Sequence, residues 1–171
     1  MLTISLIAAM SQNRVIGNQG LIPWKSKQDM DYFKQKTIGH PVIMGRKTWE
    51  SLRSRPLKDR FNIVITRDTD LQGLASDNKD GPVFVGSLEE AIDAIDDTQV
   101  LEAFIIGGTQ IYEEALRRGL VDRMYLNVMN FNVVGDTIFP YFEAKEWITQ
   151  ENKGTWNEFI SYTLIPNRQN E

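Results

Sequence analysis

The sequence predicts an α/β fold in which a mostly parallel sheet carries helices on both faces. From residue 2 to residue 119, short apolar segments alternate with segments of helical pattern, as in strands joined by crossover helices. After Gly119 the segments alternate or carry aromatic residues with no helix between them, which indicates an antiparallel edge. The length of 171 residues is that of about one domain, so we expect a single domain over residues 1–171.

The first part of the chain contains a buried strand, a long loop and a helix. Residues 2–10 form a continuous apolar run, as expected of a strand covered on both faces. Residues 11–24 are polar and contain glycine, and a loop of this length in a compact domain is often functional. A helix is expected over 27–37, ended by Gly39 and Pro41.

The same apolar and helical patterns predict the remaining strands and helices. Strands are expected at 41–44, 61–66, 82–86 and 103–108, with helices at 46–52, 87–95 and 109–119. Ser87 and Glu90 stand at the spacing of a capping box, which makes the helix at 87–95 the clearest in the chain. Residues 68–81 are a polar surface loop by composition. Later strands are expected within 122–129, 136–140 and 156–165.

Composition excludes several classes of function. The net charge of −4 gives no electrostatic reason to expect nucleic acid or an anionic membrane as partner. The chain has no cysteine and a single histidine, His40, so thiolate metal sites, cysteine nucleophiles and histidine-based triads are unsupported, and no metal is expected. The apolar segment at residues 2–10 has the pattern of a strand and not that of a signal peptide. No apolar run approaches the roughly 20 residues that span a bilayer. We expect a cytoplasmic protein.

Three strand ends carry residues suited to a nucleotide. Ligands of open α/β sheets bind beyond the carboxyl ends of the strands, where the free N–H groups of helix N-termini attract anions. The candidates are Gly45 with Arg46, Lys47 and Thr48, then Thr66 with Arg67, and then Gly107 with Gly108. Two cationic turns suit a nucleotide with an extra phosphate, although the same cations could be solvated surface charges. The glycine fingerprint of standard dinucleotide sites and the P-loop spacing are both absent.

Asp29 has two interpretations. It lies three residues after Ser26 in the first turn of the expected helix, where a carboxylate is stabilised by the helix dipole. Trp24, Met30 and Phe33 surround it in sequence, and Met30 and Phe33 are expected to turn the helix toward the core. If these side chains line a cleft, Asp29 becomes a partly desolvated carboxylate that can bind an amide-like or cationic ligand.

Six motifs, in order along nearly the whole chain, resemble the dihydrofolate reductases of the bacterial chromosomal kind. They are "ISLIAAMSQNRVIG", "IPWKSKQDMDYFK", "PVIMGRKTWESL", "RPLKDRFNIVITR", "FIIGGTQIYEEAL" and "GDTIFP". The resemblance implies a central eight-stranded sheet flanked by four helices, with an adenosine-binding part around 40–105. It also implies NADPH-dependent reduction of 7,8-dihydrofolate, hydride going to C6 and a proton to N5, by a monomer that antifolates inhibit.

The resemblance assigns roles to individual residues. Asp29 would be the single ionisable catalytic group, and Trp24 would help to hold the water that carries the proton. Arg60 would pair with the carboxylate of the substrate's glutamate. The residues that would bind substrate are Ile7, Asp29, Met30, Phe33, Leu52, Leu57, Arg60, Ile106 and Asn127. The residues that would bind NADPH are Ala9, Ile16, Gly17, Gly45, Arg46, Lys47, Thr48, Thr66, Arg67, Gly107, Gly108, Thr109, Gln110, Ile111 and Tyr112.

Two loops also resemble those of the family, and a few residues differ from its usual pattern. The loop at 11–26 resembles the family's mobile loop, and Asp136 resembles the residue that steadies its closed state. Asn127 stands where the family usually has threonine; its amide can donate to Asp29 but cannot copy a hydroxyl's donor–acceptor relay. Thr109 replaces a third glycine, and Tyr112 could belong to the core or contact a ligand. The alternatives are a riboflavin-pathway type of reductase and a non-catalytic nucleotide-binding protein.

Overall fold

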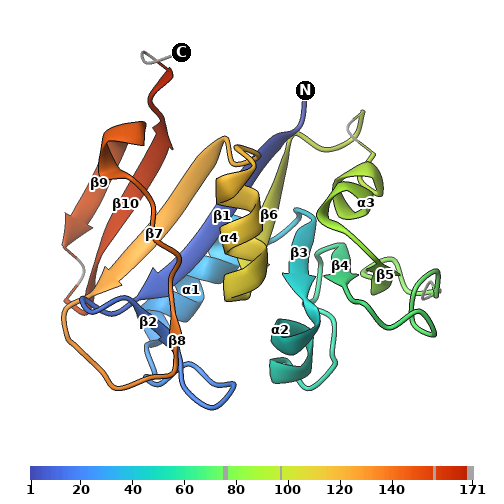
Figure 1. Cartoon of the computed structure of the whole chain (residues 1–171), viewed down its shortest axis with the longest axis horizontal. Coiled ribbons are helices and arrows are strands. Elements are labelled where there is room, and N and C mark those ends of the chain that lie inside the picture. Colours follow the sequence, from blue (N-terminus) through green and yellow to red (C-terminus); the bar gives the residue numbers. More distant parts are fainter. Residues whose placement is uncertain (75–76, 97, 156, 169–171) are drawn as a thin grey trace.

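The main sheet runs through the whole molecule. The structure is a computed structural model that describes residues 1–74, 77–96, 98–155 and 157–168 (Figure 1). Within these residues one sheet has eight strands in the order β5-β4-β3-β6-β1-β7-β10-β9. Neighbouring strands are parallel except for the pairs β7–β10 and β10–β9, which are antiparallel. The predicted fold class is confirmed, including the antiparallel edge late in the chain.

The elements have the following bounds. The strands of the main sheet are β1 (Thr3–Met10), β3 (Val42–Gly45), β4 (Asn62–Ile65), β5 (Val83–Val85), β6 (Glu102–Gly107), β7 (Arg123–Met129), β9 (Trp147–Thr155) and β10 (Phe159–Pro166). The helices are α1 (Lys27–Thr37), α2 (Arg46–Ser51), α3 (Leu88–Asp93) and α4 (Thr109–Arg117), with a 3-10 turn, η1 (Ala144–Glu146). A separate two-stranded sheet pairs β2 (Val15–Gly17) with β8 (Thr137–Ile138).

The strand predictions need three corrections. β9 was not predicted, because "WITQENKGT" is largely polar and has little of the apolar alternation that marks a strand. β2 lies inside the segment predicted as loop, and the strand predicted at 136–140 pairs with β2 instead of joining the main sheet. The start of the strand predicted at 156–165 falls on a residue outside those described, and β10 begins at Phe159. β2 and β8 form by pairing across more than a hundred residues of chain, whereas β9 forms a hairpin with β10, the next strand along the chain.

Local capping explains where two helices begin. The Oγ of Ser26 accepts the Asp29 N–H at 3.1 Å at the start of α1. The Oγ of Ser87 accepts the Glu90 N–H at 3.1 Å, while the Glu90 carboxylate accepts the Gly86 N–H at 2.9 Å. Both predicted residues therefore cap the start of α3, but Glu90 accepts the N–H of Gly86 and not that of the N-cap Ser87, so the pattern is a variant of the capping box.

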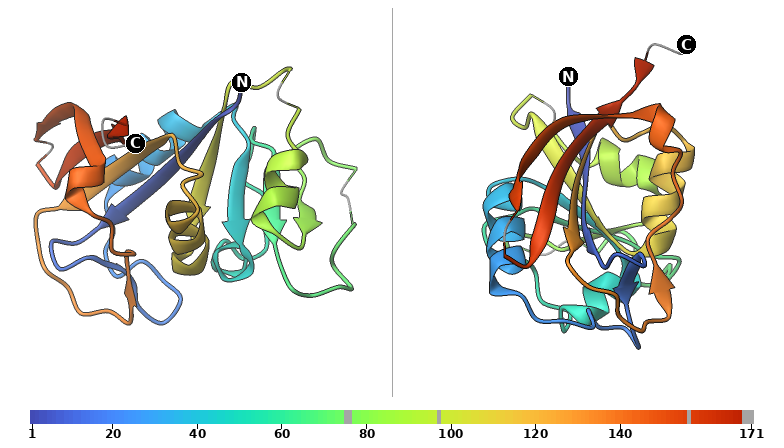
Figure 2. Two further views of the ribbon diagram at one scale, coloured as in Figure 1. Left: turned by 45° about the horizontal axis from the view of Figure 1, so that its top comes forward. Right: turned by 90° about the vertical axis from the view of Figure 1, so that its left-hand side faces the viewer.

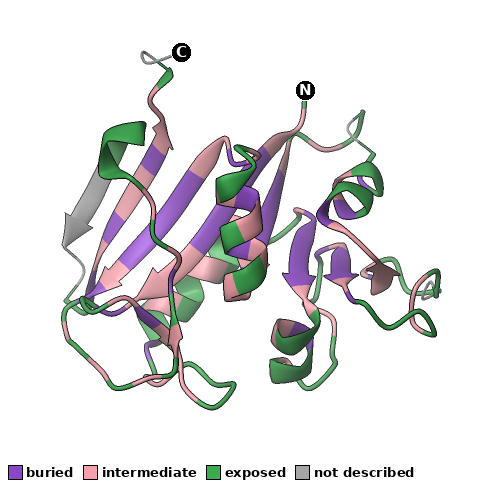
Figure 3. Ribbon diagram, in the orientation of Figure 1, coloured by how far each residue is buried: buried purple, intermediate pink, exposed green. Residues whose placement is uncertain are grey.

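Two hydrophobic cores lie on opposite faces of the sheet. Figure 2 shows α1 and α4 on the two sides, and Figure 3 shows that the central strands are the most buried part of the molecule. On the α3 and α4 side, Leu6 of β1 packs with Leu88 and Ala115. On the α1 and α2 side, the next residue, Ile7, packs with Trp49. Successive side chains of β1 thus serve different cores, as expected of a strand covered on both faces.

Candidate active site

Two glycine turns meet at the carboxyl ends of β3 and β6. A Cβ added at Gly45 would lie 3.3 Å from Ile111 Cγ1 and 3.8 Å from the Gly108 nitrogen. A Cβ added at Gly107 would lie 3.3 Å from Thr48 Oγ1, and the positive φ of 128° at Gly107 is one that other residues rarely adopt. The turns that the sequence predicted as nucleotide-binding therefore lie against each other, and glycine is what permits this.

Two helices start at these turns with their backbone N–H groups uncapped by side chains. Gly45 is the N-cap of α2 and Gly108 is the N-cap of α4, and neither has a side chain that could accept a hydrogen bond from the first turn. Free N–H groups and the positive ends of two helix dipoles therefore face the same edge of the sheet. An anionic diphosphate fits this arrangement.

The predicted cations lie around the same edge. Arg46, Lys47 and Arg67 are exposed, and Arg46 makes an ion pair with Glu50 at 3.4 Å. Thr66 is buried, and its Oγ1 accepts the Asp68 N–H at 3.1 Å, which shapes the turn after β4. The arrangement places positive charge where the sequence predicted it.

Asp29 points inward. Its backbone N–H binds the cap Ser26, while its carboxylate Oδ1 accepts a hydrogen bond from Asn127 Nδ2 at 2.9 Å. Burial raises the pKa of Asp29; the hydrogen bond from Asn127 acts in the opposite direction, and the charge of Glu158 adds to the rise. Both interpretations of the sequence were partly right, because the first turn presents the carboxylate to the sheet.

In the described part of the chain, only the nitrogen of the Asn127 side-chain amide has a hydrogen-bond partner. The side chain is 2% exposed, and its Oδ1 is a buried acceptor without a hydrogen-bond partner in the described part of the chain. A carboxylate can only accept when ionised, so the donation to Asp29 fixes which end of the amide faces Asp29. The free acceptor next to Asp29 is suited to a ligand N–H group.

The predicted apolar wall is present, with one exception. Five of the six residues pack in a single cluster on the α1 and α2 side of the sheet: Ile7, Phe33, Leu52, Leu57 and Ile106. Met30 is 68% exposed, so the expectation that it turns toward the core is wrong. Residues 29 and 33 share a helix face, whereas residue 30 is rotated by about 100° from residue 29. Trp24 is half-buried, with its ring 5.6 Å from that of Phe131.

Arg60 is held at the far end of α1. It is 7% exposed, its Nη1 donates to Thr37 Oγ1 at 3.1 Å, and its Nε donates to the Lys58 carbonyl at 3.0 Å. Desolvation lowers its pKa. Thr37 and Asp29 are eight residues apart on α1, about 12 Å at 1.5 Å per residue. An elongated ligand could therefore reach Asp29 with one end and Arg60 with the other.

The remaining cofactor candidates lie on β1, α4 and the β2–β8 sheet. Tyr112 is buried, its hydroxyl donates to the Ile7 carbonyl at 2.8 Å, and burial raises its pKa, so most of its side chain packs in the core. Ala9 pairs in register with Asn127, and Ile16 packs on the α4-side core. Thr109 Oγ1 donates to the Ile138 carbonyl at 3.4 Å, which ties the start of α4 to β8.

The loop over residues 11–26 is attached to the segment around Asp136. The Gln19 N–H donates to Asp136 Oδ2 at 2.9 Å, and the Asp136 N–H donates to the Gly17 carbonyl at 3.1 Å. The hydrogen bond from Gln19 is the main cause of a lowered pKa at Asp136. The two segments that the sequence predicted to be partners are therefore in contact.

Three neighbours of the site have no recognisable signal in the sequence. Phe131 contacts Trp24, Thr37 binds Arg60, and Glu158 accepts a hydrogen bond from the Ser26 hydroxyl. The spacing of Ser26 and Asp29 is a recognisable capping signal, but nothing in the sequence links either residue to Glu158. Ser26 and Glu158 are 132 positions apart, so tertiary packing brings them together.

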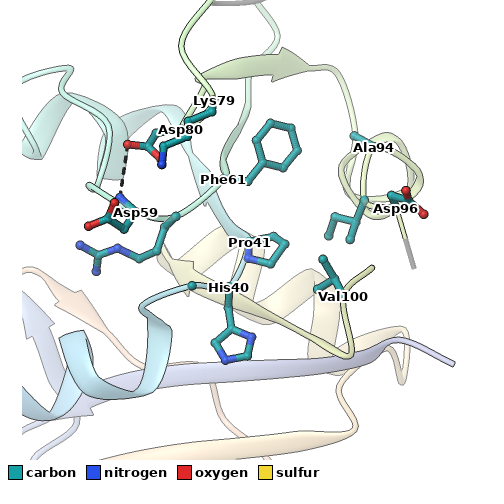
Figure 4. Close-up of a pocket in the computed structure, with 12 residues that line it drawn as sticks. His40, Pro41, Asp59, Phe61, Lys79, Asp80, Ala94, Asp96 and Val100 are labelled. Carbon is teal, nitrogen blue, oxygen red and sulfur yellow. Dashed lines mark hydrogen bonds between the residues drawn. The ribbon is translucent and has the colours of Figure 1, made fainter. Parts of the chain in front are cut away.

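A hollow of about 400 Å³ lies elsewhere, at the amino ends of the strands (Figure 4). Pro41 and Phe61, just before β3 and β4, face Val100 and Ala94 across it. The Asp59 N–H donates to Asp80 Oδ2 at 3.2 Å on its rim. It lies at the opposite ends of β3 and β4 from the glycine turns, and Arg60, which also belongs to the candidate active site, is part of its lining.

The fold and the site together define a nucleotide-dependent α/β enzyme with one partly buried carboxylate. The family model described as dihydrofolate reductase matches residues 3–165. The chain therefore belongs to the dihydrofolate reductase family, as the six motifs predicted.

Curated relatives and a solved structure agree with the family model. Dihydrofolate reductase type 3 of Salmonella typhimurium is 42% identical over 144 residues, which are 84% of this chain and 82% of the relative. Dihydrofolate reductase of Buchnera aphidicola is 41% identical over 163 residues, with 94% of each chain covered. A structure of the Enterococcus faecalis enzyme, complexed with NADP(H) and RAB-propyl, has a TM-score of 0.82 at 28% identity and covers 96% of both chains.

Proposed function

We propose that this chain reduces 7,8-dihydrofolate to tetrahydrofolate with NADPH, and that Asp29 is its ionisable catalytic group. The observation that carries the residue assignment is the inward-facing carboxylate of Asp29, which binds Asn127 beside an apolar wall. A carboxylate at this position can hold the pterin ring through its amino group and ring nitrogen. It also favours the positive charge that develops when N5 is protonated.

Asn127 would bind the pterin ring together with Asp29. Its Nδ2 donates to Asp29, and its buried Oδ1 is free to accept an N–H from the pterin amino group. Ile7, Phe33 and Ile106 supply the apolar surface against which the ring would lie. Trp24 would help to hold the water that delivers a proton to N5.

The tail of the substrate would lie along α1 toward Arg60. Arg60 is already oriented by Thr37 and Lys58, so little side-chain entropy remains to be lost when it binds a carboxylate. Leu52 and Leu57 would contact the benzoyl part of the tail. This local cation provides for an anionic substrate in a chain whose net charge is −4.

NADPH would lie across the two glycine turns and supply the hydride that reaches C6. Gly45, Gly107 and Gly108 leave room for a diphosphate at the starts of α2 and α4. Arg46, Thr66 and Arg67 would bind the 2′-phosphate in the adenosine-binding part around 40–105. The residues that would contact the rest of the cofactor are Ala9, Ile16, Gly17, Lys47, Thr48, Thr109, Gln110, Ile111 and Tyr112.

The proposed setting is a cytoplasmic monomer. In the part of the chain that the structure describes, no helix has the length and apolar character needed to cross a membrane. A chain without cysteine fits a reducing compartment. Light scattering of the purified protein tests the oligomeric state.

The first experiment follows NADPH absorbance after the protein is mixed with dihydrofolate, with NADH in a parallel cuvette. We expect rapid loss with NADPH and slow loss with NADH, because only NADPH carries the 2′-phosphate that Arg46 and Arg67 would bind. No loss of absorbance despite NADPH binding would contradict the proposed substrate.

The second experiment tests Asp29 itself. We expect Asp29→Asn to bind NADPH normally and to lose about 10²-fold or more in turnover at neutral pH, because the carboxylate is removed from the pterin site. Stopped-flow absorbance measures the hydride step, and thermal shift with NADPH confirms an intact cofactor site. Wild-type turnover in this variant would overturn the assignment.

A further inference from the structure

Ser26 lies between two carboxylate residues that come from distant parts of the chain. Its Oγ accepts the backbone N–H of Asp29 at 3.1 Å, and its hydroxyl hydrogen is donated to Oε2 of Glu158. Ser26 is 5% exposed, whereas Glu158 lies at the surface. The first turn of α1 is thus attached, through one buried hydroxyl, to the residue that precedes β10.

Glu158 is itself held in place by the strand that carries Asn127. Its backbone carbonyl accepts the Asn130 N–H at 2.9 Å, and Asn130 directly follows β7. Phe159 pairs with Met129 in the antiparallel register of β10 and β7. Asn127 and Glu158 are therefore both positioned by the β7–β10 pair. Asn127 binds the side chain of Asp29, and Glu158 binds Ser26, which accepts the backbone N–H of Asp29.

The two contacts have opposite electrostatic effects. The amide of Asn127 stabilises the ionised form of Asp29, while the negative charge of Glu158 disfavours it and adds to the effect of burial on the Asp29 pKa. Glu158 also places a second negative charge near any cation that forms beside Asp29.

We propose that Glu158 is a positioning residue for the reductase reaction: through Ser26 it fixes the Asp29-bearing turn of α1, and its charge promotes protonation in the pterin site. This inference rests on the proposed role of Asp29. Its links to the site are the hydrogen bond from Ser26 and its charge near Asp29, so it acts through these two residues.

Two tyrosines also interact electrostatically with Asp29. Among the described residues, Tyr32 of α1 and Tyr112 of α4 are electrostatically coupled to Asp29, and burial raises the pKa of each. Both hydroxyls are therefore neutral across the range in which a carboxyl titrates. Glu158 is the acidic group coupled to Asp29 in this part of the structure, and it is the one whose removal changes the local charge.

The test uses Glu158→Gln, which keeps an amide oxygen as acceptor for Ser26 but removes the charge. The reaction takes up a proton at N5, so the hydride rate falls as pH rises. We expect the midpoint of this fall to move to lower pH in Glu158→Gln, with a roughly two- to fivefold lower rate above the midpoint and an unchanged Kd for NADPH. A profile that superimposes on that of the wild type would overturn the proposal.

Two further sets of variants distinguish a specific effect of Glu158 from a general effect of losing a charge or of disturbing the fold. Glu113→Gln removes an exposed glutamate of α4, on the other side of the sheet, and should leave the profile unchanged. Ser26→Thr retains a hydroxyl and should behave as the wild type. Ser26→Ala removes the hydrogen bond that holds the Glu158 carboxylate near Asp29, so it should shift the profile in the same direction as Glu158→Gln. An equal shift in Glu113→Gln, or none in Ser26→Ala, would contradict the assigned path through Ser26.

A measurement that does not depend on catalysis distinguishes this inference from the proposed function. Carboxyl ¹³C NMR, with the Asp29 signal assigned from Asp29→Asn, follows the titration of Asp29 in the free protein. We expect its pKa to fall in Glu158→Gln, and an unchanged titration would overturn the inference even if Asp29 proves catalytic. If Asp29→Asn turns over normally, the assigned role of Asp29 fails, while the NMR titration still decides whether Glu158 acts on Asp29.

Discussion

At the scale of the residue, Asp29 combines a helix-capping position with a functional one. Its backbone satisfies the first turn of α1 through Ser26, and its side chain turns to Asn127 on β7. The sequence supplied both interpretations but could not choose between them, because the choice depends on where the helix lies on the sheet. The same dependence made Met30 look like a core residue when it is 68% exposed.

The raised pKa of Asp29 has a consequence for stability. Since the folded-state pKa exceeds the ordinary value of 3.8, the stabilising contribution is fully present below that value and is lost as pH rises through the folded pKa. We therefore expect ligand-free Asp29→Asn to be more stable than the wild type at pH 7, and the difference to disappear in acid.

Urea unfolding at several pH values measures this difference. Asp31→Asn, at an exposed position on the same helix, is the control for removal of a carboxylate. A difference for Asp29→Asn that is as large at pH 3.5 as at pH 7 would contradict the explanation by desolvation.

At the scale of the element, short segments that the sequence barely marks hold the site together. β2 and β8 have three and two residues, and they place Gly17 beside Asp136. α1 carries Asp29 near one end and Thr37, the partner of Arg60, at the other. Their positions follow from pairing and packing, not from local propensity.

The contact between Asp136 and Gln19 leads to a prediction for the loop over residues 11–26. Asp136→Ala removes a charge-assisted acceptor from the Gln19 N–H, so we expect the loop to open more often and the hydride rate to fall about tenfold. Stopped-flow kinetics measures the rate. Asp70→Ala, at another exposed aspartate, is the control and should leave the hydride rate unchanged. An equal fall in rate in this control would contradict a specific role of Asp136.

At the scale of the whole molecule, β1 connects the two cores. Leu6 is fully buried among residues of α3 and α4, and Ile7 lies in the cluster beside α1 and α2. The continuous apolar run at 2–10 predicted this double coverage, because a strand covered on one face would alternate apolar with polar residues.

The central position of β1 predicts a large cost for a cavity there. We expect Leu6→Ala to lower the free energy of unfolding by about 2–5 kcal/mol, since the side chain is 0% exposed and its neighbours are held by the sheet. Urea titration followed by circular dichroism measures the change. Leu101→Ala, at a leucine that is 77% exposed, should change it by less than about 0.5 kcal/mol, and similar costs at both positions would contradict the assignment of the core.

The sequence by itself determined the fold class, the helices, the parallel strands and the family. Each of these depends on patterns repeated over many residues, such as apolar runs, capping boxes and glycine turns, so they are recorded locally. The tertiary structure alone decided that Asp29 faces Asn127, that Met30 faces solvent, that β9 pairs with β10, and that Glu158 reaches Ser26. The contacts of Asp29 with Asn127 and of Ser26 with Glu158 join residues 98 and 132 positions apart. They depend on packing and strand register, which no local pattern contains.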